Sequence, residues 1–193
     1  MSDRENPKLN QIVSTSKSLF WKFGIKRVSI EEICQEANVS KMTFYKYFSN
    51  KNELVKHLLR KITEDALKDY NNIMNQEIPF KEKVKQSIQL KLDGTNELSQ
   101  EFYEDLHKNA DPEIMEFFNQ IVHQNVQTIY KDYINAQKKG DIRKDIKPEF
   151  ILYFLNHIYD MARDEQLIKL YESPGDLIME LTNFFFHGIL PCK

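Results

Sequence analysis

Glycine and proline are scarce in this chain, and their scarcity is the strongest constraint on its fold. The 193 residues include only 5 Gly and 6 Pro, most of them far apart. Turns between strands usually depend on such residues, and no strand-like alternation flanked by Asn-Gly or Asp-Gly is present. The sequence therefore predicts an all-α protein.

Composition excludes several other classes of protein. Apolar residues make up 41% of the chain, with 13 Phe and 9 Tyr, so a core can form and wholesale disorder is excluded. No apolar run approaches the ~20 residues of a transmembrane helix, and the N-terminus has no signal-peptide core, so no membrane partner is expected. Two cysteines, Cys34 and Cys192, make no disulfide framework. We therefore expect a reduced, cytoplasmic protein.

Apolar spacing and capping residues divide the chain into helices. In its second part, Pro79, Pro112, Pro148 and Pro174 stand where a missing N–H costs least, at the start of a helix. The expected helices cover residues 7–23, 29–38, 41–47, 51–75, 79–93, 98–108, 112–138, 148–171 and 174–188.

A tight turn joins two of the short helices. Ser29 and Glu32 have the spacing of a capping box, and Ser40 can cap the helix that follows. Asn38, between them, tolerates the left-handed backbone that a turn needs. A helix, a short turn and a second helix predict a helix-turn-helix motif over residues 29–48.

The charge of the chain is uneven along its length. Residues 1–61 carry 12 basic and 6 acidic side chains, whereas the whole chain has a formal charge of −2. A basic N-terminal region on an acidic body suggests a site for a polyanion, although chance clustering on solvated faces would give the same count.

The helix at 41–47 carries an unusual exposed face. Phe44 and Phe48 are four residues apart and should face the core. The remaining side chains combine methyl groups for thymine, phosphate donors and base-edge donors. The alternative is an ordinary surface helix with exposed aromatic residues. The side chains predicted to meet DNA are those of Lys41, Met42, Thr43, Tyr45 and Lys46.

Ser29 and Lys51 are added to this candidate site because each opens a helix. Free N–H groups and the positive end of the helix dipole suit a phosphate oxygen at such a place. A lysine there is unfavourable for the dipole unless an anion is held. The alternative for Lys51 is a surface lysine with no role.

The motif residues follow a recognisable order along the first third of the chain. They are Ile12, Leu19-Phe20, Phe23-Gly24, Val28-Ser29-Ile30-Glu31-Glu32-Ile33, Ala37-Asn38-Val39-Ser40-Lys41-Met42-Thr43-Phe44-Tyr45-Lys46-Tyr47-Phe48 and Lys51-Asn52-Glu53-Leu54. In this order and spacing, residues 6–66 resemble the DNA-binding domain of the TetR family of transcriptional regulators. The resemblance implies a dimeric, all-α repressor whose C-terminal domain binds a small-molecule inducer. It also implies that Lys41, Thr43, Tyr45 and Lys51 contact DNA and that Ser29 contacts a phosphate.

Two residues depart from the family pattern. Asn38 stands where the family usually has Gly, and it can adopt the same backbone. Met42 stands where the family often has a small residue. A long side chain on the DNA-facing side can change the bases that are read, so the operator is not carried over from the resemblance.

The sequence predicts two domains. Residues 1–66 form a three-helix DNA-binding domain, and residues 67–193 form a helical ligand-binding and dimerisation domain. The last two predicted helices are apolar on more than one face, which favours a subunit interface over the buried core of a monomer. A homodimer would match a pseudo-palindromic operator. Its interface is expected at Phe154, Ile158, Leu181 and Phe185.

Polar residues within the C-terminal helices are candidates for an effector pocket. Those selected are Tyr103, His107, Asn156 and His157, and the expected ligand is small and mostly apolar. Each of them could equally be a satisfied buried polar group. No catalytic or metal-binding motif is visible, so neither enzymatic activity nor a cofactor is expected.

The sequence thus predicts a sequence-specific transcriptional regulator, a repressor released from its operator by a ligand. Two alternatives remain open. One is a DNA-bound interaction or architectural protein without an inducer. The other is an all-α enzyme, which would need a cluster of perturbed acids or a nucleophile with its base.

Overall fold

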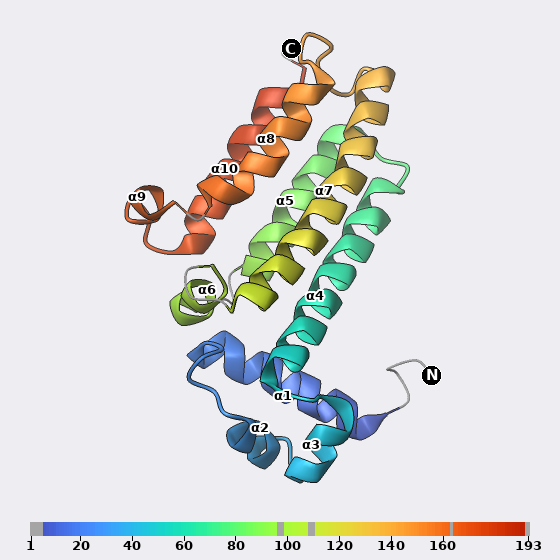
Figure 1. Ribbon diagram of the computed structural model, residues 1–193. Coiled ribbons are helices and arrows are strands. Elements are labelled where there is room, and N and C mark those ends of the chain that lie inside the picture. Colours follow the sequence, from blue (N-terminus) through green and yellow to red (C-terminus); the bar gives the residue numbers. More distant parts are fainter. Residues whose placement is uncertain (1–5, 96–98, 108–110, 163, 192–193) are drawn as a thin grey trace. The chain divides into compact units, whose positions relative to one another are not determined.

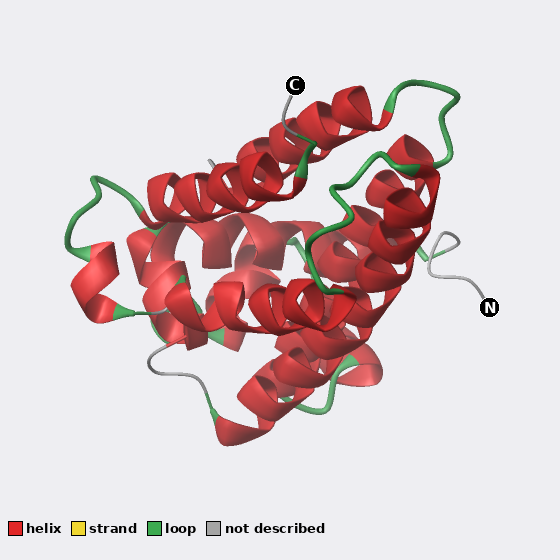
Figure 2. Ribbon diagram, turned by 90° about the horizontal axis from the view of Figure 1, so that it is seen from above, coloured by secondary structure: helices red, strands yellow, loops and turns green. Residues whose placement is uncertain are grey.

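The computed structural model describes residues 6–95, 99–107, 111–162 and 164–191. These residues form helices and loops and no strand, which confirms the predicted all-α class (Figure 1, Figure 2). The helices are α1 (Pro7–Phe23), α2 (Ile30–Glu36), α3 (Lys41–Tyr47), α4 (Lys51–Met74), α5 (Phe80–Thr95), α6 (Gln100–His107), α7 (Pro112–Lys139), α8 (Pro148–Met161), α9 (Glu165–Ile168) and α10 (Pro174–Ile189).

The chain forms two compact units, and each combines two stretches of sequence. Unit 1 contains residues 1–62 and 97–118, and unit 2 contains residues 63–96 and 119–193. The sequence predicted one boundary after residue 66, with everything beyond it in the second domain. In the structure α6 packs on α1, where the rings of Trp21 and Phe102 lie 4.3 Å apart, so α6 belongs to the N-terminal unit.

The core of unit 1 is aliphatic and aromatic, and it draws on all four N-terminal helices. Its fully buried side chains include Ile12, Phe20, Ile33, Phe44 and Leu54. These positions recur at helical spacing along α1 to α4, as expected of helices that each bury one face, and Phe44 is buried as predicted.

Local signals also set the ends of these helices. Gly24 ends α1 with a φ of 81°, and Asn38 ends the α2 region with a φ of 50°; both conformations are unfavourable for most other residues. The predicted caps are present, because Ser29 Oγ accepts the N–H of Glu32 and Ser40 Oγ accepts that of Thr43, each over 3.1 Å. Short connections with defined caps leave the helix-turn-helix little freedom.

Unit 2 has its own core, built where α5, α7, α8 and α10 meet. Its buried side chains include Phe80, Tyr133, Ile142, Ile151 and Phe186. Gly140, with a φ of 89°, follows the last residue of the long helix α7, close to the predicted end at residue 138.

One predicted helix is divided in two. The sequence predicted a single helix over residues 148–171, but α8 ends at Met161 and α9 begins at Glu165. Asp164 is the reason, since its carboxylate accepts the N–H groups of Gln166 and Leu167 and so caps a new helix.

Candidate DNA interface

The helix-turn-helix presents α3 on a rigid base. Phe44 is fully buried and Phe48 nearly so, and their rings lie 5.8 Å apart beneath the helix. The turn before α3 is closed by a hydrogen bond of 2.9 Å from Val39 N to Cys34 O. The backbone that carries the exposed side chains of α3 is therefore well supported.

The outer face of α3 exposes the residue types predicted to meet DNA. Met42 is 82% exposed and Tyr45 54% exposed, and Lys41 and Lys46 are exposed beside them. Thr43 is half-buried, with its hydroxyl 2.9 Å from that of Ser40. Large apolar groups flanked by cations are suited to base edges and phosphates at once.

Lys41 has a partner that the sequence did not indicate. Its ammonium donates to the carboxylate of Glu31 on α2, ten residues earlier. The hydrogen bond lowers the pKa of Glu31 and raises the pKa of Lys41, so both groups stay charged near neutral pH. Both side chains are largely exposed, so a phosphate can compete for the lysine at small cost.

The Ser29 hydroxyl can still donate a hydrogen bond to a phosphate. Its oxygen accepts the Glu32 N–H, which leaves the hydroxyl proton available on an exposed residue. The side chain of Glu32 does not complete the capping box; it lies 3.8 Å from Arg27 Nη1 instead.

Lys51 opens α4 as predicted, but its ammonium faces the loop between α1 and α2. Its ammonium donates to the backbone carbonyls of Ile25, Lys26 and Val28, over 2.9, 3.3 and 3.0 Å. An ammonium has three N–H donors, so all of them are used by the chain itself. In this structure the Lys51 ammonium thus binds the loop between α1 and α2.

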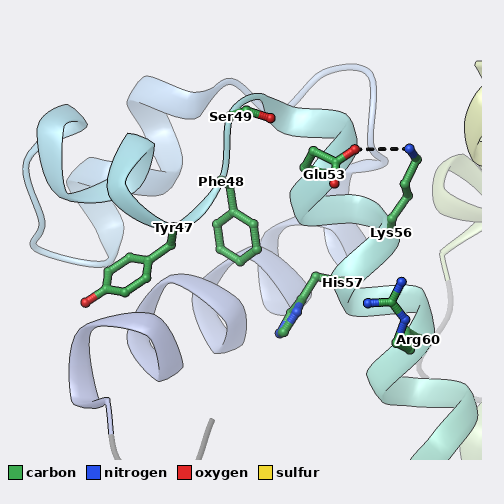
Figure 3. Close-up of a pocket in the computed structure, with 7 residues that line it drawn as sticks. All are labelled: Tyr47, Phe48, Ser49, Glu53, Lys56, His57 and Arg60. Atoms are coloured by element: carbon green, nitrogen blue, oxygen red, sulfur yellow. Dashed lines mark hydrogen bonds and ion pairs between the residues drawn. The ribbon is translucent and has the colours of Figure 1, made fainter. Parts of the chain in front are cut away.

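A polar hollow of about 370 Å³ opens beside α3, where the chain turns into α4 (Figure 3). It is lined by Tyr47, Phe48, Ser49, Glu53, Lys56, His57 and Arg60. Lys56 donates to Glu53 over 3.0 Å and also to Glu113, so two carboxylates surround its charge. Arg60 adds a second cation to the lining, so Lys56 and Arg60 are matched by the carboxylates of Glu53 and Glu113. A phosphate site needs surplus positive charge, and this balance argues against one here.

The predicted effector residues are divided between the units. Tyr103, on α6 in unit 1, is buried; His107 ends the same helix, and its side chain lies outside the described part. Asn156 and His157 are on α8 in unit 2, where the His157 ring stacks on Tyr153 at 3.9 Å. Neither unit alone brings the four together.

The predicted dimer residues include one that belongs to the core. Phe185 is only 6% exposed, and its ring stacks on that of Phe154 at 5.3 Å within the same chain. Phe154, Ile158 and Leu181 are half-buried. The large exposed apolar side chains of α8 and α10 are instead Phe150, Tyr153 and Phe184, the last 72% exposed.

The described residues contain no group of three or more His, Cys, Asp or Glu placed to hold a metal ion. Within the same residues, no helix is both long and apolar enough to span a bilayer.

Known proteins match this chain in both sequence and fold. The family model for bacterial regulatory proteins of the tetR family matches residues 12–58. The uncharacterized HTH-type transcriptional regulator YhgD of Bacillus subtilis (strain 168) is 25% identical over 154 residues, covering 77% of this chain and 78% of the relative.

Two solved structures have the same fold along nearly the whole chain. A putative transcriptional regulator from Saccharomonospora viridis in complex with choline has a TM-score of 0.70 and 19% identity, over 95% of this chain and 97% of that one. The regulator FadR from Bacillus subtilis in complex with stearoyl-CoA has a TM-score of 0.68 and 14% identity, over 93% and 98%. With the motif at 29–48 and the exposed face of α3, these matches identify the chain as a DNA-binding transcriptional regulator whose residues 12–58 are similar to the tetR family.

Proposed function

We propose that the chain is a homodimeric repressor that binds a pseudo-palindromic operator through α3 and leaves it when a small molecule binds unit 2. The observation that carries the DNA-reading part is the outer face of α3. Met42 and Tyr45 are exposed on a helix whose opposite face is fully buried, and no core of the chain needs them. A major groove offers thymine methyl groups to the first and phosphates to the second. Such a repressor acts in the cytoplasm.

The DNA-reading part can be tested without knowing the operator. Duplexes selected by the protein from a random pool should contain two inverted half-sites, with centres about 34 Å or more apart. Anisotropy titrations of the selected duplex should then show affinity well above that for a random duplex, by 10³-fold or more. Selection without symmetric half-sites, or affinity equal to that for random DNA, would contradict the proposal.

Exposed aromatic residues on α8 and α10 support the dimer. Phe150, Tyr153 and Phe184 are all more than half exposed. Water-exposed rings on neighbouring helices indicate a covered surface in the assembled protein. A second copy of the chain is the partner that a two-fold operator requires.

A buried hydroxyl in unit 2 supports an effector site. Tyr70 Oη is buried and has no hydrogen-bond partner at standard geometry, although the Asp132 carboxylate is close enough to interact with it. Burial, the nearby Tyr133 and the carboxylate of Asp132 all raise the pKa of Tyr70, so the hydroxyl keeps its proton. A buried donor without a well-formed hydrogen bond is costly, and an acceptor oxygen on a bound molecule would satisfy it better.

Choline and stearoyl-CoA serve as probes of two effector chemistries, since structural neighbours are known in complex with them. A probe that acts should raise the melting temperature of the protein and weaken its DNA binding, and DNA should weaken probe binding by the same factor. The Tyr70→Phe variant should show a smaller rise in melting temperature when the probe binds. An equal rise in melting temperature for the wild type and Tyr70→Phe would show that Tyr70 is not part of the effector site. A probe that binds without changing DNA binding would favour a regulator without an inducer.

A further inference from the structure

The loop of residues 24–28, between α1 and α2, is held by charged side chains from two distant helices. Lys51 reaches it from the start of α4, and Asp105 reaches it from α6. The loop leads directly into Ser29, the cap of the helix-turn-helix. Its shape therefore sets where the motif begins.

Lys51 holds the loop of residues 24–28 through hydrogen bonds to its backbone. Its three donors take three of the loop's backbone carbonyls, which would otherwise turn toward water or remain unpaired. The side chain is half-buried, and burial lowers the pKa of its ammonium. A cation at a helix N-terminus is unfavourable, and the carbonyl oxygens offset that cost locally.

Asp105 fastens the same loop from α6. Its Oδ2 accepts the N–H of Lys26 over 2.7 Å. The same oxygen would lie 2.6 Å from a Cβ on Gly24, so a side chain there would displace the carboxylate, and the φ of 81° itself favours glycine. The Asp105 carboxylate also acts to raise the pKa of Lys51, so the two charges favour each other across the loop.

The position of α6 is itself fixed on α1. Ser99 N donates to Trp21 O over 3.2 Å, just before α6 begins, and the rings of Trp21 and Phe102 are in contact. Asp105 is thus presented to the loop by a docked helix, not by a mobile segment.

We propose that Lys51 and Asp105 are positioning residues for DNA binding, which hold the 24–28 loop, and through Ser29 the helix-turn-helix, without touching DNA themselves. The proposal rests on the DNA-binding function described above. It differs from the role that the TetR resemblance implies for Lys51, because an ammonium with three carbonyl partners has no donor left for a phosphate.

The salt dependence of DNA binding separates a positioning lysine from a phosphate ligand. Binding of the full-length protein to a random-sequence duplex is titrated over a range of salt concentrations. Lys51→Met keeps the stem of the side chain and removes the charge. We expect its affinity to fall by about tenfold with an unchanged salt slope, because no phosphate contact is lost. Lys46→Met, on the exposed face of α3, is the matched control and should lower the slope by about one per subunit.

For Asp105, the direction of the change in DNA affinity distinguishes a positioning role from a simple charge effect. Removing a negative charge strengthens binding to DNA if charge alone matters, and Glu36→Ala, at an exposed residue of α2, should do so. Asp105→Ala should instead weaken binding by about tenfold and speed amide hydrogen exchange at Lys26, whose N–H loses its acceptor. Asp105→Asn keeps an acceptor oxygen and should recover most of the affinity.

Different results would contradict the positioning role of Lys51 and Asp105 and the proposed DNA-binding function. A salt slope lowered by about one per subunit in Lys51→Met, or Asp105→Ala binding as tightly as the wild type, overturns the positioning role. Circular dichroism at the titration temperature checks that each variant is folded, and Asp105→Asn keeps the test decisive if Asp105→Ala unfolds. A wild-type protein that binds no DNA overturns the proposed function and this inference together.

Discussion

The outer face of α3 and the exposed side of α8 and α10 both present large apolar side chains to water, but their surroundings differ. On α3, Met42 and Tyr45 lie among lysines on a short helix capped at its start. On α8 and α10, Phe150, Tyr153 and Phe184 project from longer helices whose other faces build the core of unit 2. Cations beside the exposed apolar groups fit a charged groove, whereas aromatic groups without cations fit another protein surface. The residues around an exposed side chain therefore indicate its partner better than its hydrophobicity does.

The adjacent residues Phe184 and Phe185 provide the sharpest test of this comparison and the largest expected effect. Phe185→Asp places a carboxylate in the core of unit 2. We expect loss of the folded state, because the free-energy cost of burying an unpaired charge exceeds the free energy of unfolding of most domains. Phe184→Asp places the same charge on the exposed side of α10. It should leave the helical content unchanged and weaken self-association by 100-fold or more.

Sedimentation at micromolar concentration and thermal unfolding separate the two outcomes. The wild type should sediment as a dimer and Phe184→Asp as a folded monomer. If Phe184→Asp remained dimeric, the exposed side of α10 would lie outside the interface, and α3 would be the one remaining face assigned to a partner.

Local signals explain how much of this fold the sequence could predict. Gly24, Asn38 and Ser40 fix their turns through their own backbone preferences or a cap within three residues, so the boundaries of the first three helices were predictable. The break after Met161 was missed, although Asp164 carries an ordinary cap signal, because the continuous apolar pattern favoured a longer helix.

The functional residues that sequence reasoning missed depend on distant partners. Asp105 and Lys26 are separated by 79 residues, and no spacing rule links them. Lys51 was identified as important, but its partners are backbone carbonyls, which leave no trace in the identity of residues 25–28. Phe184 and Phe185 are identical in type, and Phe185 is the buried one because it packs on the rings of Phe154 and Tyr133.

A second prediction concerns the apolar part of the α3 face. Met42→Ala removes most of an 82% exposed side chain without touching the core, so the folded state should keep its stability. If Met42 packs on a thymine methyl group, affinity for the selected operator should fall by about tenfold while affinity for random DNA stays constant. Titration of both duplexes measures the ratio. An equal loss on both would mean that Met42 contributes no sequence information.

The smallest expected effect concerns the cations beside Met42, and it arises from the pair formed by Glu31 and Lys41. Glu31→Gln removes the carboxylate that holds Lys41 in free protein, so DNA no longer has to compete for the lysine. We expect affinity to rise by about two- to fivefold, a change typical of an exposed pair.

The same pair predicts how acid affects the free protein. The hydrogen bond from Lys41 lowers the pKa of Glu31 below its usual value of 4.5, so its contribution to folding is complete above that value and is lost as the pH falls through the lowered pKa. Glu31→Gln should therefore unfold slightly more easily than the wild type at pH 7, and the difference should vanish in acid and in high salt. Thermal unfolding at several pH values measures it, with Glu36→Gln as the control for an acidic residue of α2. A difference that persisted in acid would come from packing or capping by Glu31, and DNA affinity unchanged in Glu31→Gln would show that Lys41 does not contribute its charge to the α3 face.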